Sequence, residues 1–188
     1  MRTNPDVLII GGGLAGLASA LHLSKKGLKV ILIEKNTYPK HKVCGEYISN
    51  EILPYFYWLD LDVRELHPTS ISNFEFTAQN GKTVKTKLPL GGFGISRYEL
   101  DCFLFEKAVE NGCTILTETV TNVTFENDIF TVTTSEEILS AKIVLGAYGK
   151  RSNIDQVLSR EFISKKSPWL AVKAHYKGNI DETLVGLY

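Results

Sequence analysis

The chain has 188 residues, of which 44% are hydrophobic and 22% are charged. Such a length and composition are typical of a globular domain that buries its own core. The 21 basic residues balance the 21 acidic residues, so the formal net charge is zero. A balanced charge provides no electrostatic basis for binding nucleic acid, and we expect no nucleic-acid partner.

The three cysteines, Cys44, Cys102 and Cys113, are odd in number and lack the spacing of metal ligands. This usage predicts free thiols in a reducing compartment and no metal site. The first apolar run, Val7–Ile10, leads directly into glycines and does not resemble a secretory signal. No apolar stretch has the length of a transmembrane helix. We therefore expect a cytoplasmic protein.

Residues 6–35 have the order strand, glycine-rich turn, helix, strand. Val7–Ile10 and Val30–Ile33 are short apolar runs rich in β-branched residues, as in strands that are buried on both faces. Between them Gly11, Gly13 and Gly16 complete the pattern G-x-G-x-x-G, and apolar residues follow at helical spacing. This arrangement predicts a βαβ unit.

Each position in this pattern has a physical reason in a dinucleotide site. Gly11 permits a tight turn, Gly13 lets a pyrophosphate approach the backbone, and Gly16 lets the helix pack closely on the sheet. The helix start, at Leu14 and Ala15, offers free N–H groups and a partial positive charge to phosphates.

Glu34 ends the second strand, about 20 residues beyond the glycines, where a carboxylate accepts hydrogen bonds from ribose hydroxyls. A glycine-rich turn without a ligand would need none of this context. Because strand, glycines, helix, strand and acid occur in order, the segment predicts a dinucleotide site.

The middle of the chain departs from the βαβ order. Residues 36–46 are polar and contain Pro39, as in a loop. The apolar spacing over Tyr47–Leu59 predicts a helix that Pro54 kinks or splits. Ile71–Leu88 alternates as a β-hairpin around a two-residue Asn80-Gly81 turn, so we expect a second sheet outside the dinucleotide fold.

The remaining elements follow from periodicity and turn residues. We expect a flexible approach at Gly91–Arg97 and then a helix at Tyr98–Asn111. Strands should follow at Thr114–Leu116, Val120–Phe125, Ile129–Thr134 and Ile138–Ala141, and the chain should return to the parallel sheet at Lys142–Ala147. A capping loop at Gly149–Asn153, a helix at Ile154–Ser159, and strands at Leu170–Tyr176 and Leu184–Tyr188 should complete the chain.

Four segments, which together span nearly the whole chain, resemble the FAD-dependent oxidoreductases built like the aromatic hydroxylases. Within that group they are most similar to the geranylgeranyl reductase-like branch. The segments are GGGLAG at Gly11–Gly16 with Glu34-Lys35, the K-x-C-G segment at Lys42–Glu46, the R-x-x-L-D helix start at Arg97–Asp101, and Gly146–Ser152, which is similar to the turn G-A-D-G-x-x-S.

The resemblance implies an α/β fold, a Rossmann-like FAD-binding domain of a parallel sheet plus a β-meander, with inserted strands of a second, substrate-side sheet that looks incomplete. We expect residues 1–70 and 90–160 to form the discontinuous FAD-binding domain. Residues 71–89 and 165–188 would form part of a substrate-binding β-sheet domain.

The resemblance also implies an extended FAD with its pyrophosphate over Gly11–Gly16 and its adenosine ribose on Glu34. Lys35 would lie along the adenine side, and Val120 would contact adenine through its backbone. Gly149, in the fourth segment, would be a further cofactor contact.

On the flavin side the resemblance implies that Cys44, Gly45 and Glu46 line the isoalloxazine cavity and that Arg97 contacts the flavin phosphate or ribityl region. The residues leave other interpretations open. Cys44 could be a small packing residue, and Glu46 an acid that favours the start of the following helix. Arg97 could pair with acids of its own helix. We assign no catalytic residue.

The chemistry implied is reduction of the flavin by NAD(P)H or another donor, followed by hydride transfer to a C=C bond of a hydrophobic, isoprenoid-like small molecule. A monooxygenase or halogenase on the same scaffold is the first alternative, and a non-catalytic dinucleotide-binding fragment is the second. The hairpins argue against a simple NAD-dependent dehydrogenase. An isoprenoid substrate would require peripheral membrane contact, for which the sequence offers no support.

Two features depart from the family pattern. Tyr148 stands where the family turn has aspartate, so the carboxylate contact of that turn is missing. The Gly-Asp segment that holds the ribityl and pyrophosphate groups in the family does not occur in the 188 residues. We therefore expect the sequence to be the N-terminal half of a larger oxidoreductase or a truncated product.

Overall fold

The computed structural model describes residues 5–150, 152–164 and 168–188. Its contacts divide the chain into two compact units. The first unit comprises Met1–Lys40 and Asp101–Leu170, and the second comprises His41–Leu100 and Ala171–Tyr188. The predicted division into a cofactor part and a substrate part concerns function and stays a prediction.

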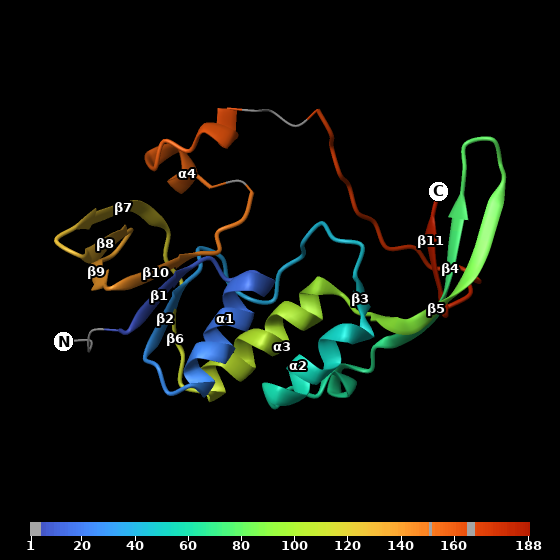
Figure 1. Cartoon of the computed structure of the whole chain (residues 1–188), viewed down its shortest axis with the longest axis horizontal. Coiled ribbons are helices and arrows are strands. Elements are labelled where there is room, and N and C mark those ends of the chain that lie inside the picture. Colours follow the sequence, from blue (N-terminus) through green and yellow to red (C-terminus); the bar gives the residue numbers. More distant parts are fainter. Residues whose placement is uncertain (1–4, 151, 165–167) are drawn as a thin grey trace. The chain divides into compact units, whose positions relative to one another are not determined.

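The first unit is built on a parallel sheet with the strand order β10-β1-β2-β6 (Figure 1). Val7 of β1 pairs with Val30 of β2 on one side and with Ile143 of β10 on the other. The predicted βαβ unit and the return of the chain into its sheet are both confirmed. The bounds are β1 Val7–Ile10, α1 Leu14–Lys25, β2 Val30–Ile33, β6 Thr114–Leu116 and β10 Ile143–Gly146.

Every residue of β1 and β2 is buried, because both faces of the sheet are covered. On one face α1 packs against both strands through its buried side. On the other face Leu8 and Ile10 join a core cluster with Val123, Val132 and Leu139 of the antiparallel meander β7-β8-β9. The predicted meander is confirmed, with bounds β7 Val120–Glu126, β8 Ile129–Thr134 and β9 Ile138–Ala141.

Two further helices frame this unit. The predicted helix after residue 96 is confirmed as α3, Arg97–Glu110. The boundary between the two units falls inside α3, between Leu100 and Asp101. The short helix α4, Ile154–Val157, contributes the buried Ile154 to the core cluster, and a 3-10 turn follows at Glu161–Ser164. Arg151, in the predicted capping loop, lies outside the described residues.

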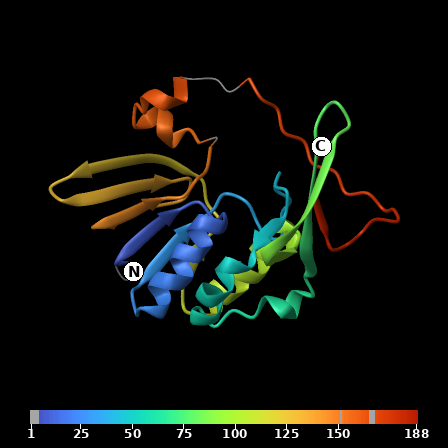
Figure 2. The ribbon, with the colours of Figure 1, turned by 45° about the vertical axis from the view of Figure 1, so that its right-hand side comes forward.

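The second unit contains a mixed sheet with the order β11-β4-β5-β3 (Figure 2). Strands β4 and β5 form the predicted antiparallel hairpin, and β11 pairs parallel to β4. A second sheet outside the dinucleotide fold is thus confirmed. The bounds are β3 Tyr47–Ser49, β4 Thr69–Thr77, β5 Thr83–Gly94 and β11 Leu184–Leu187.

The predicted helix over Tyr47–Leu59 is wrong in its first half. The segment begins as β3, continues as a 3-10 turn at Asn50–Ile52, and becomes α2 only at Leu53–Trp58. Pro54 lies in the first turn of α2, where its missing N–H has no partner to lose, so it starts the helix and does not kink it. Apolar spacing could not reveal that residues 47–49 pair with β5. Another 3-10 turn follows at Val63–Leu66.

Two predicted loops of the hairpin are also wrong. The turn comprises residues 78–82 because β4 ends at Thr77 and β5 begins at Thr83, so Asn80-Gly81 is not a two-residue turn. The predicted flexible approach at Gly91–Arg97 is strand as far as Gly94. A Cβ at Gly92 would lie 2.4 Å from the Tyr47 ring, so close pairing with β3 requires glycine there.

The predicted strand over Leu170–Tyr176 is wrong as well, since no strand is assigned there within the described part of the chain. Leu170, Val172 and Tyr176 are more than 80% exposed, so the alternation of apolar residues does not correspond to a buried face. None of the helices among the described residues is long and apolar enough to cross a membrane.

Candidate functional site

The turn after β1 is shaped by two glycines that no other residue could replace without a shift of the backbone. Gly11 has φ +104°, and a Cβ there would lie 2.5 Å from the carbonyl oxygen of Ala147. A Cβ at Gly16 would lie 1.9 Å from the carbonyl oxygen of Gly11. The geometry therefore bears out the turn predicted at Gly11 and the close packing predicted at Gly16.

Gly13 differs from its neighbours. It is the N-cap of α1, with φ −84° and ψ −174°, and no side chain caps the helix there. A Cβ at Gly13 would meet nothing within 4 Å. The first N–H groups of α1, among them those of Leu14 and Ala15, have no acceptor inside the helix. This end of the helix is therefore open to an anion.

Glu34 is 7% exposed and lies just beyond β2, beside this turn. Its Oε2 accepts the Gly12 N–H at 2.8 Å. Its Oε1 accepts the Asn36 backbone N–H at 3.0 Å and the Asn36 side-chain amide at 2.8 Å, and lies 2.5 Å from the Lys40 ammonium. Burial alone would raise the pKa of Glu34, but these donors outweigh it and hold the pKa at about 2. The carboxylate is ionised throughout the physiological range.

Tyr38 adds a contact that the sequence pattern did not reveal. Its phenol donates a hydrogen bond to the carbonyl of Gly12. Its ring stacks on Phe105 of α3, with centroids 4.6 Å apart and planes 21° apart. The Lys40 ammonium lies 5.0 Å from the centre of the same ring. The residues after Glu34 form a loop, and no sequence periodicity predicts where the side chains of a loop lie. Only the fold therefore shows that these groups are in contact.

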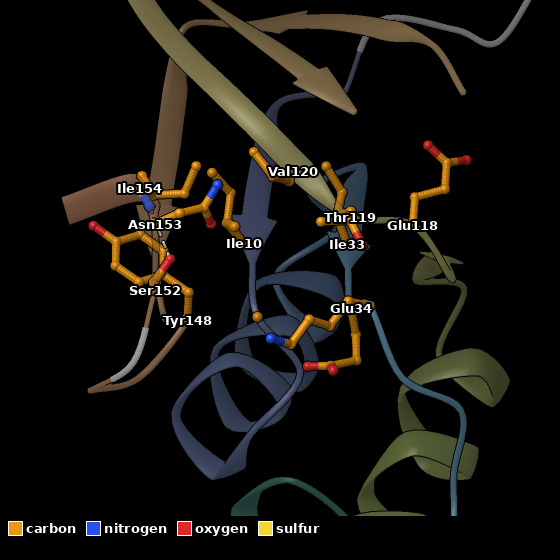
Figure 3. A pocket seen from close by; sticks show the side chains of 12 residues that line it. Ile10, Ile33, Glu34, Glu118, Thr119, Val120, Tyr148, Ser152, Asn153 and Ile154 are labelled. Atoms are coloured by element: carbon orange, nitrogen blue, oxygen red, sulfur yellow. Dashed lines mark hydrogen bonds between the residues drawn. The ribbon is translucent and has the colours of Figure 1, made fainter. Parts of the chain in front are cut away.

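A pocket opens at the carboxyl ends of β1 and β2 (Figure 3). Four of the residues predicted to bind the cofactor line it: Gly11, Glu34, Lys35 and Val120. The pocket thus lies at the edge of a parallel sheet where ligands of such folds bind. The other lining residues were not predicted as cofactor contacts, and they are Ile10, Ile33, Glu118, Thr119, Tyr148, Ser152, Asn153 and Ile154.

Tyr148, at the position of the family aspartate, forms one wall of this pocket beside Ser152 (Figure 3). Its phenol donates a hydrogen bond of 2.9 Å to Asp155, which is 5% exposed. Burial, and then the contact with Asp155, raise the pKa of Tyr148. A carboxylate is therefore present near the turn, but it comes from α4 and accepts a bond from the phenol.

Ser152 has a structural part in this wall, since its Oγ accepts the Ile154 N–H at 3.1 Å. Ser152 is the last residue of the turn that resembles G-A-D-G-x-x-S. Its place in that motif could have identified it from the sequence as a residue of the site. Gly149 has φ +76°, so it serves the turn conformation, and the structure does not test its predicted cofactor contact.

The residues predicted for the flavin side lie in the second unit. The Glu46 carboxylate accepts the Arg97 N–H at 2.6 Å, and the Cys44 sulfur accepts the Glu46 N–H at 3.5 Å. Three of the four residues are thus brought together, and Gly45 lies between two of them in the chain. Glu46 itself has φ +58°, which is uncommon for a residue with a side chain.

Glu46 is also held by residues more than a hundred positions away. It pairs with the Lys173 ammonium and lies 3.0 Å from the His175 ring nitrogen. Burial would raise its pKa, but the bonds from Lys173, the Arg97 N–H and His175 lower it. His41 in turn packs against Tyr98, with ring centroids 4.7 Å apart. Sequence reasoning missed this cluster, because no local pattern connects residues 46 and 173.

Known proteins are similar to this chain in sequence over much of its length. Residues 6–43 match the family described as FAD dependent oxidoreductase. An uncharacterized protein of Methanosarcina barkeri is 30% identical over 159 residues, which are 82% of this chain and 40% of that protein. Menaquinone reductase of Mycolicibacterium smegmatis is 25% identical over 191 residues, or 93% of this chain and 45% of that protein. Digeranylgeranylglycerophospholipid reductase of Picrophilus torridus is 31% identical over 126 residues, which are 61% of this chain and 30% of that protein.

Solved structures share the fold. The p-nitrophenol 4-monooxygenase of Pseudomonas putida superposes with a TM-score of 0.73 at 19% identity, over 84% of this chain and 44% of that one. A flavin-dependent brominase has a TM-score of 0.68 at 22% identity, over 86% of this chain and 41% of that one. The chain spans less than half the length of each of these relatives. Residues 6–43 are therefore similar to the FAD-dependent oxidoreductases, and the chain shares the fold of these solved structures.

Proposed function

We propose that the first unit binds FAD, with the pyrophosphate over Gly13 and the start of α1. The observation that carries the proposal is the contrast among the three motif glycines. Gly11 and Gly16 are enclosed by backbone, whereas Gly13 faces open space at a helix end with no cap. An open glycine at a helix N-terminus is the arrangement that a pyrophosphate requires. The residues present therefore fit the group.

The adenosine ribose would lie on Glu34. Its Oε2 accepts the Gly12 N–H and its Oε1 accepts from Asn36 and Lys40, so these donors fix the orientation of the carboxylate. The ionised carboxylate is a strong acceptor at neutral pH, and a ribose hydroxyl would share Oε2 with the Gly12 N–H.

The remaining predicted contacts belong to the same proposal. Lys35 and Val120, which line the pocket beside Glu34, would contact the adenine side. In the second unit the group formed by Cys44, Glu46 and Arg97 would serve the flavin half, with Gly45 allowing close approach. The first unit would thus hold the adenosine and pyrophosphate part of the cofactor, and the sheet of the second unit would serve the substrate.

For the activity we infer an FAD-dependent oxidoreductase that reduces C=C bonds of a hydrophobic, isoprenoid-like substrate, with NAD(P)H as the electron donor. Relatives named as a menaquinone reductase and a digeranylgeranylglycerophospholipid reductase support this substrate class. FAD supplies the hydride chemistry when bound, and the protein contributes binding and orientation. Here those tasks fall to the Gly13 turn and Glu34.

A halogenase or monooxygenase is the second candidate, because flavin-dependent halogenases of Aspergillus carbonarius and Armillaria mellea are also similar to this chain. The two candidates differ in their use of oxygen. Oxygen consumption that is stoichiometric with product would favour the monooxygenase or halogenase. Product formation under argon with NADPH and FAD would favour the reductase.

The proposal is tested by FAD retention. The purified protein is mixed with FAD and desalted, and the flavin absorbance per chain is compared with that of Gly13→Ala. The alanine is compatible with φ −84° and meets no atom within 4 Å, so the free energy of unfolding should fall only by the cost of a weaker N-cap, about 1 kcal/mol or less. Its methyl group would occupy the path of the pyrophosphate, and FAD affinity should fall about tenfold or more, or about 1.4 kcal/mol.

Gly178→Ala is the matched control, because its added Cβ would lie 4.0 Å from the nearest atom and the residue belongs to the second unit, outside the motif. It should retain FAD like the unaltered protein. A protein that retains no FAD at high concentration, or a Gly13→Ala variant that retains it fully, would overturn the proposal.

A further inference from the structure

Gly12, the residue between the first two motif glycines, has both of its backbone polar groups bound by side chains. Its N–H donates to Glu34 Oε2 at 2.8 Å, and its carbonyl accepts from the Tyr38 phenol. A Cβ at Gly12 would lie 1.9 Å from the phenol oxygen, so the two residues are in direct contact. The loop after β2 thus holds a peptide of the glycine-rich turn.

The orientation of this peptide determines where the next amide points. A trans peptide is planar, so its N–H points opposite to its C=O. Because the Gly12 carbonyl is directed at Tyr38, the N–H of Gly13 is directed away from Tyr38. Gly13 is also the residue whose surroundings are open. The phenol therefore determines the direction of one donor in the proposed phosphate site.

Tyr38 is itself held in place. Its ring stacks on Phe105, and the Lys40 ammonium lies 5.0 Å from its centre. Lys40 also lies 2.5 Å from the Glu34 carboxylate. Gly12, Glu34, Tyr38 and Lys40 consequently form one network, which we call the turn network. All four members belong to the first unit.

We propose that Tyr38 is a positioning residue of the dinucleotide site, which orients the Gly12–Gly13 peptide so that the Gly13 N–H is available to the pyrophosphate. The proposal rests on the proposed function. Without the phenol hydrogen bond, the peptide could rotate and turn the Gly12 carbonyl toward the phosphates. A carbonyl oxygen repels a phosphate that an N–H would bind.

The test is Tyr38→Phe, which keeps the ring on Phe105 and removes only the hydroxyl. Binding of ADP and of adenosine is measured by titration, and FAD binding by flavin fluorescence. We expect the affinity for ADP and FAD to fall about tenfold and that for adenosine to be unchanged, because only the first two place phosphates at the turn. Tyr57→Phe, at a residue 55% exposed on α2, is the control and should bind all three normally.

A role of Tyr38 in stability alone would weaken ADP and adenosine equally, and that result would overturn the proposal. So would unchanged ADP binding. If the unaltered protein binds neither FAD nor ADP, the proposed function fails, and the positioning itself is then tested without a ligand. In Tyr38→Phe the amide resonance of Gly13 should shift in the ¹⁵N spectrum while that of Gly27, after α1, stays in place. An unmoved Gly13 resonance would show that Tyr38 does not orient this peptide.

Discussion

The parallel sheet of the first unit and the mixed sheet of the second unit are held in different ways. Strands β1 and β2 are buried along their whole length, between α1 and the meander. Strands β4 and β5 are exposed or only half-buried at most positions and depend on pairing with their neighbours. The turn that follows β1 is therefore enclosed by packed backbone, whereas the β4–β5 turn is not. A change of one atom should therefore lower the free energy of unfolding far more in the first sheet than in the second.

The largest effect is expected from Gly16→Ala. Its Cβ would lie 1.9 Å from the Gly11 carbonyl oxygen, which is backbone and cannot rotate away. We expect the free energy of unfolding to fall by about 3 kcal/mol, as for severe overpacking. Urea denaturation followed by circular dichroism measures this.

The control for that variant is Gly81→Ala in the β4–β5 turn. Gly81 has φ +79° but no atom within 4 Å of an added Cβ, so only the conformational cost of about 1 kcal/mol remains. Equal losses in the two variants would contradict the contrast between the sheets.

A loss of similar size at neutral pH is expected from Glu34→Gln, but it should depend on pH. The pKa of Glu34 is about 2 in the folded protein and near 4.5 when unperturbed. A lowered folded pKa means that the stabilisation is complete above pH 4.5 and is lost as the pH falls toward 2. At pH 7 the variant should lose roughly 3 kcal/mol, and near pH 2 it should match the unaltered protein.

Glu75→Gln tests the same chemistry in the second sheet. The ion pair with Lys85 lowers the pKa of Glu75, but the Lys85 side chain is 71% exposed. Salt and water screen such a pair, so the pH dependence should change much less than in Glu34→Gln. Because both carboxylates are buried, a larger change for Glu75→Gln would mean that the exposure of the paired lysine does not explain the difference.

The smallest effect is expected from Tyr148→Phe. It removes the 2.9 Å hydrogen bond to the buried Asp155 and leaves the ring over Gly146. We expect the free energy of unfolding to fall by about 1 kcal/mol, which thermal or urea denaturation would detect. Tyr57→Phe again provides the control, and a loss no larger than in that variant would mean that the Asp155 contact contributes nothing.

The first unit could be predicted closely because its signals are local. Two apolar runs bounded by glycines are sufficient to define β1, α1 and β2, and their observed bounds agree with the pattern. The second unit was predicted less well, since β3 pairs only with the end of β5, and that end is itself held by β3 and by the start of β4. The exposed stretch at Leu170–Tyr176 has a strand-like alternation but no assigned partner strand.

The same distinction applies to the site. The sequence by itself determined the glycines and Glu34, because short-range backbone geometry restricts which residues can turn from a strand into a helix and end the next strand. Only the tertiary structure decided that Tyr38 binds Gly12, that Tyr148 binds Asp155, and that Glu46 meets Lys173. Those contacts depend on where loops and distant segments come to lie after the sheets have packed. No periodicity in the chain records that arrangement.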